Sequence, residues 1–429
     1  MQSSRGKTIV EKIVGRAAGV DAVRKGQIVT ANVDFAFAHD SSGPRRWQPH
    51  LDRLGVGLWD PEKVAIVTDH FVPAVDAQSA EILRLSREFA QAQKVSSFFD
   101  MIGIAHLVLP EKGLIRPGAF VAGGDSHSPT GGAFGAYVAG YGATDMLGIV
   151  VTGQTWIRVP DTYRIELNGA LPKGVVAKDI MLILCREVGM DNAFTAFEFA
   201  GSTVESMQMF ERMVLSNMAT ELGGEAGIIA PDQTTCDFLR ERAKPVDDEQ
   251  KVMELASDPD ADYSSNFTLD VGALVPQVAA PHSPANTRNA NGFSDVRIDQ
   301  AYIGACVGAK PSDLLMAAEV LKGRKVADGT RLLIAPASTE TMNGAAADGT
   351  LAALTDAGSI ILPSGCGACA GMGAGLLAEG DVCISSTNRN FQGRMGHSGS
   401  RVYLSSPYTV AASAITGRIT DPREFLSES

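Results

Sequence analysis

Short apolar runs alternate with helix-like stretches along the chain, and this alternation restricts the fold more than any other feature. The apolar runs include KVAIVTDH, GAFVAGGDSH, EAGIIAPD, TRLLIAP and DVCISSTN, and the helix-like stretches include SAEILRLSREFAQAQ and PSDLLMAAEVLKG. Runs of this length form strands that are buried on both faces, and such strands need helices to cover them. The sequence therefore predicts an α/β protein with largely buried strands.

The alternation is interrupted in two places, which predict domain boundaries. Between about residues 255 and 297 the chain carries DPDADYSS, a proline-containing stretch and SPANTRNANG, and a weaker break follows WIRVPD near residue 160. A chain of 429 residues is long enough for two or three domains with separate cores. We expect domains at residues 1–160, 161–296 and 297–429.

Polar side chains follow three of the apolar runs directly. Asp69 and His70 follow VAIVT, residues 125–127 (Asp-Ser-His) follow AFVAGG, and Asn388 and Arg389 follow DVCISST. Each group is expected at the carboxyl end of a strand, where open α/β sheets build their sites. If these strand ends converge, they form one pocket.

The histidines allow a functional and a structural interpretation. His70 and His127 each have an acidic neighbour that can orient the ring and raise its pKa, which favours a role in proton transfer. The alternative is a histidine whose hydrogen bonds are satisfied in the core or in a loop. His106, in GIAHLVLPEKG, has no adjacent acid, so its local sequence indicates a structural role.

Two cysteines three residues apart, Cys366 and Cys369, lie among glycines in GCGACAG. They are two small buried thiols, a redox pair or metal ligands, and the pair alone does not decide. Cys306, in IGACVGAK, also follows an apolar run between glycines and supplies a third thiol. Three thiolates suit a [4Fe–4S] cluster with one iron open to substrate, whereas a structural zinc site needs four protein ligands. We assign structural roles to the three other cysteines, Cys185, Cys236 and Cys383.

The segment NRNFQGR places Arg389 and Arg394 five residues apart, next to Asn388. Two guanidinium groups at this spacing can bind carboxylates, and the alternative is a surface loop with two solvated arginines. The formal net charge of −12 argues against a nucleic-acid-binding surface, so we expect an anionic small molecule as the ligand.

No apolar run approaches the roughly 20 residues that a membrane span requires. The N-terminal segment has basic residues but no continuous apolar stretch of the kind that secretory signals carry. We therefore expect no membrane association and a cytoplasmic location, where closely spaced cysteines are more often metal ligands or redox groups than disulfides.

Several motifs, in a fixed order, resemble the aconitase superfamily. They are GGDSHSPTGGAFGAYVAGYGATD, IGACVGAKPSDLLMAAEVLKGRKV, GCGACAGM and ISSTNRNFQGRMG. The length, the opening TIVEKIVGRAAG and the ending SPYTVAASAITGRITDPREF are similar to the large subunits of two-subunit 3-isopropylmalate dehydratases and homoaconitases. The resemblance covers nearly the whole chain.

This resemblance implies a hydro-lyase large subunit of three α/β/α domains around one [4Fe–4S] cluster, with these site residues. The cluster ligands implied are Cys306, Cys366 and Cys369. The catalytic residues implied are Asp69, His70, His106, Asp125, His127 and Glu221, with Asp125 and His127 as the second acid–histidine pair. The substrate-binding residues implied are Asn217, Asn388, Arg389 and Arg394. His106, Asn217 and Glu221 enter through the resemblance alone, which replaces the structural interpretation of His106.

The resemblance also implies a partner. Single-chain aconitases have a fourth, swivelling domain that supplies a serine base and further arginines, and no part of this sequence corresponds to it. We expect a separate small subunit to supply that domain, with the active site at the subunit boundary.

The sequence departs from the family pattern at Val307-Gly308, where Thr-Asn is common, and in HDSSGPRRW, where Arg45 or Arg46 replaces a glutamine-containing stretch. His397 is also unusual. These departures keep several functions open beside 3-isopropylmalate dehydratase: homoaconitase, or a hydratase for dimethylmaleate, maleate or citraconate. From other classes, a non-catalytic iron–sulfur sensor that binds RNA and a structural zinc protein remain alternatives.

Overall fold

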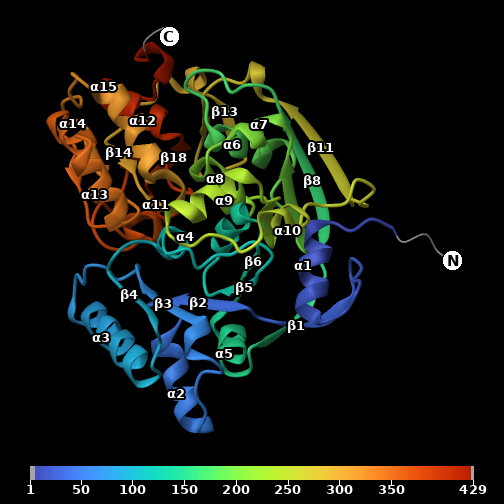
Figure 1. Ribbon diagram of the computed structural model, residues 1–429. Coiled ribbons are helices and arrows are strands. Elements are labelled where there is room, and N and C mark those ends of the chain that lie inside the picture. Colours follow the sequence, from blue (N-terminus) through green and yellow to red (C-terminus); the bar gives the residue numbers. More distant parts are fainter. Residues whose placement is uncertain (1–4, 427–429) are drawn as a thin grey trace.

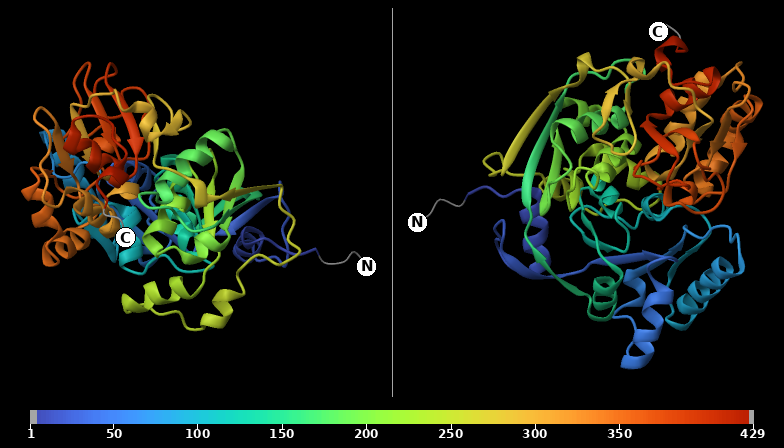
Figure 2. Two further views of the ribbon diagram at one scale, coloured as in Figure 1. Left: turned by 90° about the horizontal axis from the view of Figure 1, so that it is seen from above. Right: turned by 180° about the vertical axis from the view of Figure 1, so that it is seen from behind.

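The computed structural model describes residues 5–426, which form four β-sheets (Figure 1). Three of them are built on parallel strands and covered by helices, and this confirms the predicted α/β class. Seen from behind, the first sheet lies below, the last lies above, and the middle segment lies beside them (Figure 2).

The first sheet has five parallel strands in the order β4-β3-β2-β5-β6. Its strands are β2 (Phe35–His39), β3 (Val64–Thr68), β4 (Ser97–Asp100), β5 (Phe120–Gly123) and β6 (Tyr137–Gly140). The chain builds outward from β2 in one direction and then returns to β5 on its other side. The switch point, where a crevice opens at the carboxyl ends, lies between β2 and β5.

The last sheet has seven strands in the order β13-β12-β18-β17-β14-β15-β16. Its strands are β12 (Gln277–Ala279), β13 (Thr287–Asn289), β14 (Gln300–Ile303), β15 (Arg331–Ile334), β16 (Ile360–Ile361), β17 (Val382–Ser385) and β18 (Arg401–Ser405). Strands β14 to β18 are parallel and repeat the order of the first sheet, with the switch point between β14 and β17.

A four-stranded parallel sheet in the order β10-β9-β8-β11 lies between these two in the sequence. Its strands are β8 (Asp161–Asn168), β9 (Thr195–Ala200), β10 (Ala226–Ile229) and β11 (Ser265–Asp270). The fourth sheet is an antiparallel ribbon of β1 (Ile28–Asn32) and β7 (Gln154–Arg158). The division into three domains stays a prediction, and because β12 and β13 pair with the last sheet, a second boundary near residue 276 would keep every sheet intact.

The helices cover these sheets and mostly begin at clear capping signals. Asp76 caps one helix through the backbone N–H of Ser79, and Pro311 occupies the first turn of another. The helices are α1 (Ile9–Ala18), α2 (Pro44–Leu54), α3 (Ala77–Ala92), α4 (Ala105–Glu111), α5 (Ala143–Thr152), α6 (Ala177–Glu187), α7 (Ser202–Ser206), α8 (Met209–Met218), α9 (Gln233–Glu241), α10 (Glu249–Met253), α11 (Ala305–Gly308), α12 (Pro311–Leu321), α13 (Thr339–Ala347), α14 (Thr350–Asp356) and α15 (Pro407–Thr416). None of the described helices is long and apolar enough to cross a membrane.

One hydrophobic core joins the first and last sheets through α8. Buried Val67 of β3, Met213 of α8 and Ile303 of β14 belong to the same cluster. This shared core brings the two sheets together, and it thereby brings their carboxyl ends together.

Candidate active site

The loops that follow the strands of the first and last sheets meet at one place. The backbone carbonyl of Asp69, after β3, accepts a hydrogen bond of 2.8 Å from the backbone N–H of Cys366, after β16. The Asp69 carboxylate accepts a second bond, also 2.8 Å, from the N–H of Ala105 at the start of α4. The groups expected at the strand ends also meet, because His70 Nε2 lies 4.0 Å from Asp125 Oδ2 and Arg389 Nη1 donates to Ser126 Oγ over 3.2 Å.

Three histidines of this site each lie within hydrogen-bond distance of a carboxylate. His70 Nδ1 lies 2.6 Å from Asp69 Oδ1, and His106 Nε2 lies 2.7 Å from Asp125 Oδ1. Asp125 Oδ1 is therefore closer to His106 than to Nδ1 of its expected partner His127, which lies 3.7 Å away, and it also accepts the backbone N–H of residue 127. His127 Nε2 instead meets Glu221, at 3.0 Å.

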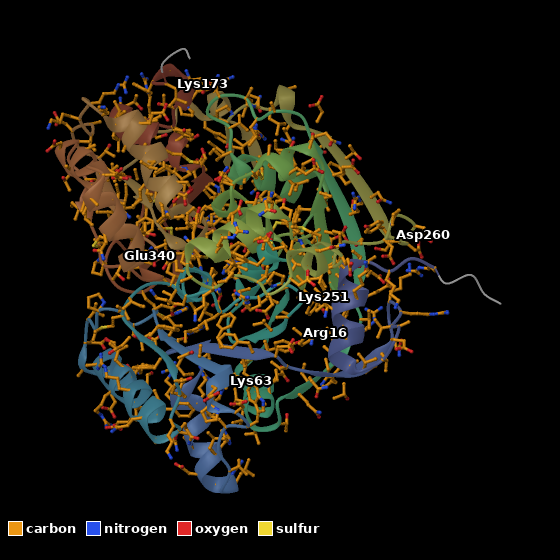
Figure 3. The ribbon with its side chains drawn as sticks, viewed as in Figure 1. Arg16, Lys63, Lys173, Lys251, Asp260 and Glu340 are labelled. Carbon is orange, nitrogen blue, oxygen red and sulfur yellow. The ribbon has the colours of Figure 1, made fainter. Side chains whose placement is uncertain are left out.

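These pairs shift the pKa values of their acids in one direction. Burial alone would raise the pKa of Asp69, but the charge and hydrogen bond of His70 outweigh it and lower that pKa. Burial likewise opposes ionisation of Asp125, and the bonds from His106 and His39 hold its pKa well below the usual range. In contrast to charged residues such as Lys63 and Glu340 on the outside (Figure 3), these charges persist in the interior because each has a partner.

His70 is the histidine whose own pKa moves most clearly. Burial would lower the pKa of its ring, and the carboxylates of Asp69, Asp125 and Asp40 raise it to about 9. The ring is therefore an imidazolium at neutral pH and holds a proton that it can donate.

Sequence reasoning missed His39, which ends β2, and Asp40, which follows it. The His39 ring stacks on His70 with 3.8 Å between centroids, and its Nε2 lies 3.5 Å from Asp125 Oδ2. The Asp40 carboxylate accepts the backbone N–H groups of residues 69, 70 and 71 and so fixes the loop that carries His70. The signal was present, because His39-Asp40 follows the apolar run FAFA as Asp69-His70 follows VAIVT.

The histidine and carboxylate atoms nearest to His70 are also close enough to hold a cation. The ligand atoms of His39, Asp40, Asp69 and His70 lie within 4.8 Å of one another. Hydrogen bonds and ring stacking within the protein already engage each of these groups, so the cluster needs no ion to explain it.

The three predicted thiols come together on the other side of the site. Cys306 lies in α11 after β14, Cys366 directly precedes the short 3₁₀ turn Gly367–Ala370, and Cys369 lies within that turn. The Sγ atoms of Cys306 and Cys369 each lie 3.8 Å from Oδ1 of Asn388, and all six cysteines of the chain are free thiols. The three remaining cysteines lie outside this group, as predicted.

The surroundings of these thiols fit an iron–sulfur cluster. Burial raises the pKa of Cys306 to about 12, so this thiol stays neutral until a metal replaces its proton. Burial, nearby carboxylates and the neighbouring thiols Cys306 and Cys369 also raise the pKa of Cys366 well above its ordinary value. The amide N–H of Asn217 donates to Cys306 Sγ over 3.1 Å, the kind of bond that cluster sulfurs accept.

The predicted substrate-binding residues border the thiols. Arg389 donates to Glu221 through Nε at 2.7 Å and to Ser126 Oγ through Nη1 at 3.2 Å. Arg394 lies against the cysteine turn, where its carbonyl would be 3.0 Å from a side chain placed at Gly371. Its buried Nε has no hydrogen-bond partner within residues 5–426, which leaves a donor for a ligand.

Two buried polar groups hold the segment of residues 387–389. The Asn388 amide donates to Oδ1 of Asn217, which lies at the end of α8. Lys178, at the start of α6 and also missed from the sequence, donates through Nζ to the carbonyl of Thr387 over 2.6 Å. Burial lowers the pKa of Lys178 to about 8, against the opposing pull of Glu221.

The departures from the family pattern have local explanations. Gly308 is required because a Cβ there would lie 2.3 Å from Ser386 Oγ, and Val307 is buried in a second core. Arg45 lies over the ring of Phe71 at 5.6 Å, next to His70. His397 accepts the N–H of Gly399 in a turn of the loop before β18.

Comparison with known proteins assigns the chain to the family that its sequence motifs resemble. A profile of the Aconitase family (aconitate hydratase) matches residues 11–293 and 286–417. The chain is 47% identical to 3-isopropylmalate dehydratase large subunit 1 of Methanopyrus kandleri, over 98% of this chain and 100% of that protein. It is 43% identical to the protein of that name from Pyrococcus furiosus, over 98% and 99% of the two chains. It is 41% identical to the probable methanogen homoaconitase large subunit of Methanothermobacter thermautotrophicus, over 97% of each. This chain belongs to the aconitase family.

Proposed function

We propose that this chain is the large subunit of a [4Fe–4S]-dependent hydro-lyase that dehydrates and rehydrates a hydroxy dicarboxylic acid of the 3-isopropylmalate type. The observation that carries the proposal is the meeting of three buried thiols with three histidine–carboxylate pairs in one site. Membership of the aconitase family implies an iron–sulfur cluster. Two of its relatives carry the name 3-isopropylmalate dehydratase large subunit.

The residues that would hold the cluster are Cys306, Cys366 and Cys369. When bound through three thiolates, such a cluster supplies an iron with an open position, a Lewis acid for hydroxyl and carboxylate oxygens. Asn217 supports the thiolate form of Cys306 by donating to its sulfur.

His70 is assigned as the acid that protonates the departing hydroxyl. Asp69 holds its Nδ1–H, so Nε2 is the atom that gives up the proton. Asp40 and His39 fix the position of the ring through backbone bonds and stacking. Hydroxide is a poor leaving group, and a positioned proton donor of this kind accelerates its departure by about 10²- to 10⁴-fold.

Arg389 and Arg394 are assigned to the substrate carboxylates, with Asn388 beside them. Arg389 is 18% exposed at its side chain, and Arg394 has an unpartnered buried Nε, so both can reach a dianion in the site. The remaining pairs, His106 with Asp125 and His127 with Glu221, line the site as hydrogen-bond donors of fixed orientation.

A small subunit completes the site in this proposal. Removal of the weakly acidic proton next to a carboxylate requires a base and positive charge on the developing anion. The relatives are named as large subunits, so we assign the base to a separate small subunit that carries the swivelling domain. The three-domain division of the large subunit stays part of this proposal.

A homoaconitase is the second candidate, because one relative at 41% identity bears that name. The two functions differ in the substituent on the substrate, which is branched and apolar in one and a further carboxylate in the other. Arg45, stacked over Phe71 beside His70, is the residue of this chain placed to favour the extra carboxylate.

The test is anaerobic purification of the tagged chain from its own host, with whatever copurifies, followed by alkene absorbance on a substrate panel. The panel contains 3-isopropylmalate, homoisocitrate, citrate, dimethylmalate, citramalate and malate. We expect a brown protein with about four irons per chain, a small copurifying subunit and turnover of 3-isopropylmalate. Colourless protein that contains zinc, or iron-loaded protein inactive on every acid, would overturn the proposal. Binding of RNA by the apoprotein would favour the sensor alternative.

A further inference from the structure

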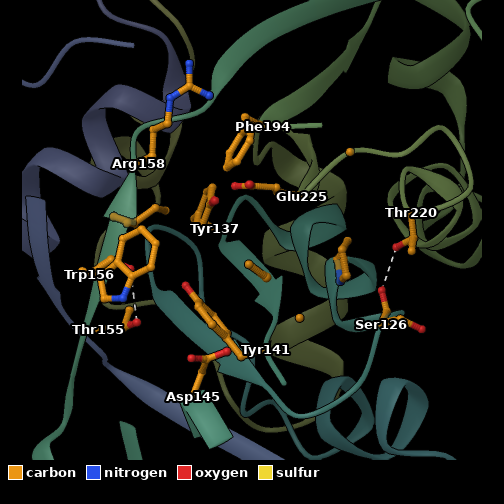
Figure 4. A pocket seen from close by; sticks show the side chains of 15 residues that line it. Ser126, Tyr137, Tyr141, Asp145, Thr155, Trp156, Arg158, Phe194, Thr220 and Glu225 are labelled. Atoms are coloured by element: carbon orange, nitrogen blue, oxygen red, sulfur yellow. Dashed lines mark hydrogen bonds between the residues drawn. The ribbon is translucent and has the colours of Figure 1, made fainter. Parts of the chain in front are cut away.

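A pocket of about 400 Å³ lies beside the candidate active site and takes no part in the proposed chemistry (Figure 4). Its walls come from β6, β7 and the loops before β9 and β10, so it joins the first sheet to the middle one. It shares Ser126 with the active site. Ser126 Oγ accepts Arg389 on one side, and its carbonyl accepts Thr220 Oγ1 at 2.8 Å on the other.

The rim of this pocket exposes large apolar side chains. Trp156, on the antiparallel ribbon, is 67% exposed, and Phe194, before β9, is 47% exposed with the Arg158 guanidinium 4.6 Å from its ring. Exposed aromatic residues that gather around a concave surface are typical of sites where another protein docks.

The interior of the pocket contains a buried hydroxyl and two carboxylates. Tyr137 is fully buried and lines the pocket, yet its hydroxyl has no hydrogen-bond partner within the described residues. Asp145 and Glu225 also line it, and Arg158, the one cation among the lining residues, stacks on Phe194 and only partly offsets the effect of burial, which raises the pKa of Glu225. An occupant that combines an apolar side chain with a basic one would satisfy both the aromatic rim and these carboxylates.

We propose that this pocket is the docking surface for the small subunit, which inserts an apolar and a basic side chain between Trp156, Phe194 and Glu225. The inference rests on the proposed function, since it takes the partner from there. Ser126 connects the pocket to the active site, because it lines the pocket and accepts a hydrogen bond from Arg389. A chain bound in the pocket is therefore next to the place where the missing base is needed, which favours the small subunit as the partner. The reacting groups would then be closed off from water on that side.

The test measures binding of the small subunit, purified separately, to the cluster-loaded large subunit by biolayer interferometry under anaerobic conditions. Trp156→Ala and Phe194→Ala come from different elements, and each is expected to raise the Kd at least tenfold, as anchor residues do. Ile360→Ala removes an apolar side chain that is 53% exposed on β16, outside the pocket, and should change the Kd less than twofold. Circular dichroism and iron content verify that each variant is folded and loaded.

A second measurement uses the unmodified chain, because a substitution at Trp156 could alter the β1–β7 ribbon and weaken binding indirectly. Hydrogen exchange of the wild-type chain should slow at residues 154–158 when the small subunit is added, and exchange at residues 360–361 should not change. Unchanged Kd values for both aromatic variants, or unchanged exchange at 154–158, would overturn the docking surface even if the complex is an active dehydratase. Tight binding that depends on Trp156 and Phe194, in a complex that turns over none of the acids, would refute the proposed reaction and support the docking surface.

Discussion

The first and last sheets have the same strand order about a central switch point, but the loops at their carboxyl ends carry different chemistry. After β3, β4 and β5 these segments hold histidines paired with carboxylates. Around β14 and β17 they hold thiols and amides, which are neutral until a metal binds. The fold therefore fixes where a site forms, and the residues after each strand decide whether it moves protons or holds metal.

The largest expected effect comes from removing a thiol, which should damage the half of the site built on the last sheet and leave the half built on the first sheet intact. Cys306→Ser should abolish cluster binding and lower kcat by about a thousandfold or more, because the Lewis acid is lost. Iron analysis and alkene absorbance measure both effects. Cys383→Ser, at an equally buried cysteine outside the site, is the matched control and should keep its iron. Iron retained by the Cys306 variant would remove this residue from the ligand set.

The converse experiment damages only the histidine half. Asp69→Asn removes the carboxylate that most raises the pKa of His70, and we expect kcat to fall by about 10²- to 10³-fold with unchanged iron content. Asp100→Asn, at the end of the neighbouring strand β4, should change kcat less than about threefold. An Asp69 variant that loses its iron would show that the two halves are not separable.

His39→Phe tests a residue outside the expected set. Phenylalanine keeps the stacking on His70 but removes the nitrogen near Asp125, so we expect kcat to fall about fivefold, with iron content and KM unchanged. Steady-state kinetics over the substrate range measure the split. A variant with wild-type kcat would mean that only the flat ring of His39 matters.

The smallest expected effect concerns the seam between the two halves. Glu111 of α4 accepts Ser338 Oγ at 2.7 Å across that seam, and burial raises its pKa to about 7 despite this bond. Because the folded pKa lies above the unfolded value, the contribution of Glu111 to stability is full below about pH 4.5 and is lost as pH rises to about 7. Glu111→Gln should therefore raise the free energy of unfolding at pH 8 by about 2 kcal/mol, leave it unchanged near pH 4.5 and leave kcat unaltered.

Denaturant titration at the two pH values measures this difference. Leu315→Ala, at a side chain that is 51% exposed on α12, provides a surface comparison with no expected pH dependence. An equal stability gain at both pH values would show that packing, and not ionisation, explains the effect of Glu111.

The sequence predicted the α/β class and the strand ends because apolar runs followed by polar residues have a direct local signal. It did not predict the shortest side-chain contacts, since Asp125 and His127 are neighbours in sequence but have their closest partners in His106 and Glu221. Asn217 and Glu221 have no local signal, because they lie near the end of α8 and in the turn after it, and reach the site only through the packing of α8 against the first sheet. Lys178 was missed for the same reason, whereas His39 was missed although His39-Asp40 directly follows the apolar run FAFA.

The single hydrogen bond between Cys366 and Asp69 ties the loop of one sheet to the loop of the other. This contact links the position of a cluster ligand to the loop of the acid, which Asp40 and Ala105 also hold. If release of iron relaxed the cysteine turn, the loop of the proton donor would lose this one of its contacts. Assembly of the cluster would then also help to position the acid. A large subunit without its cluster would stay inactive and would not catalyse a side reaction.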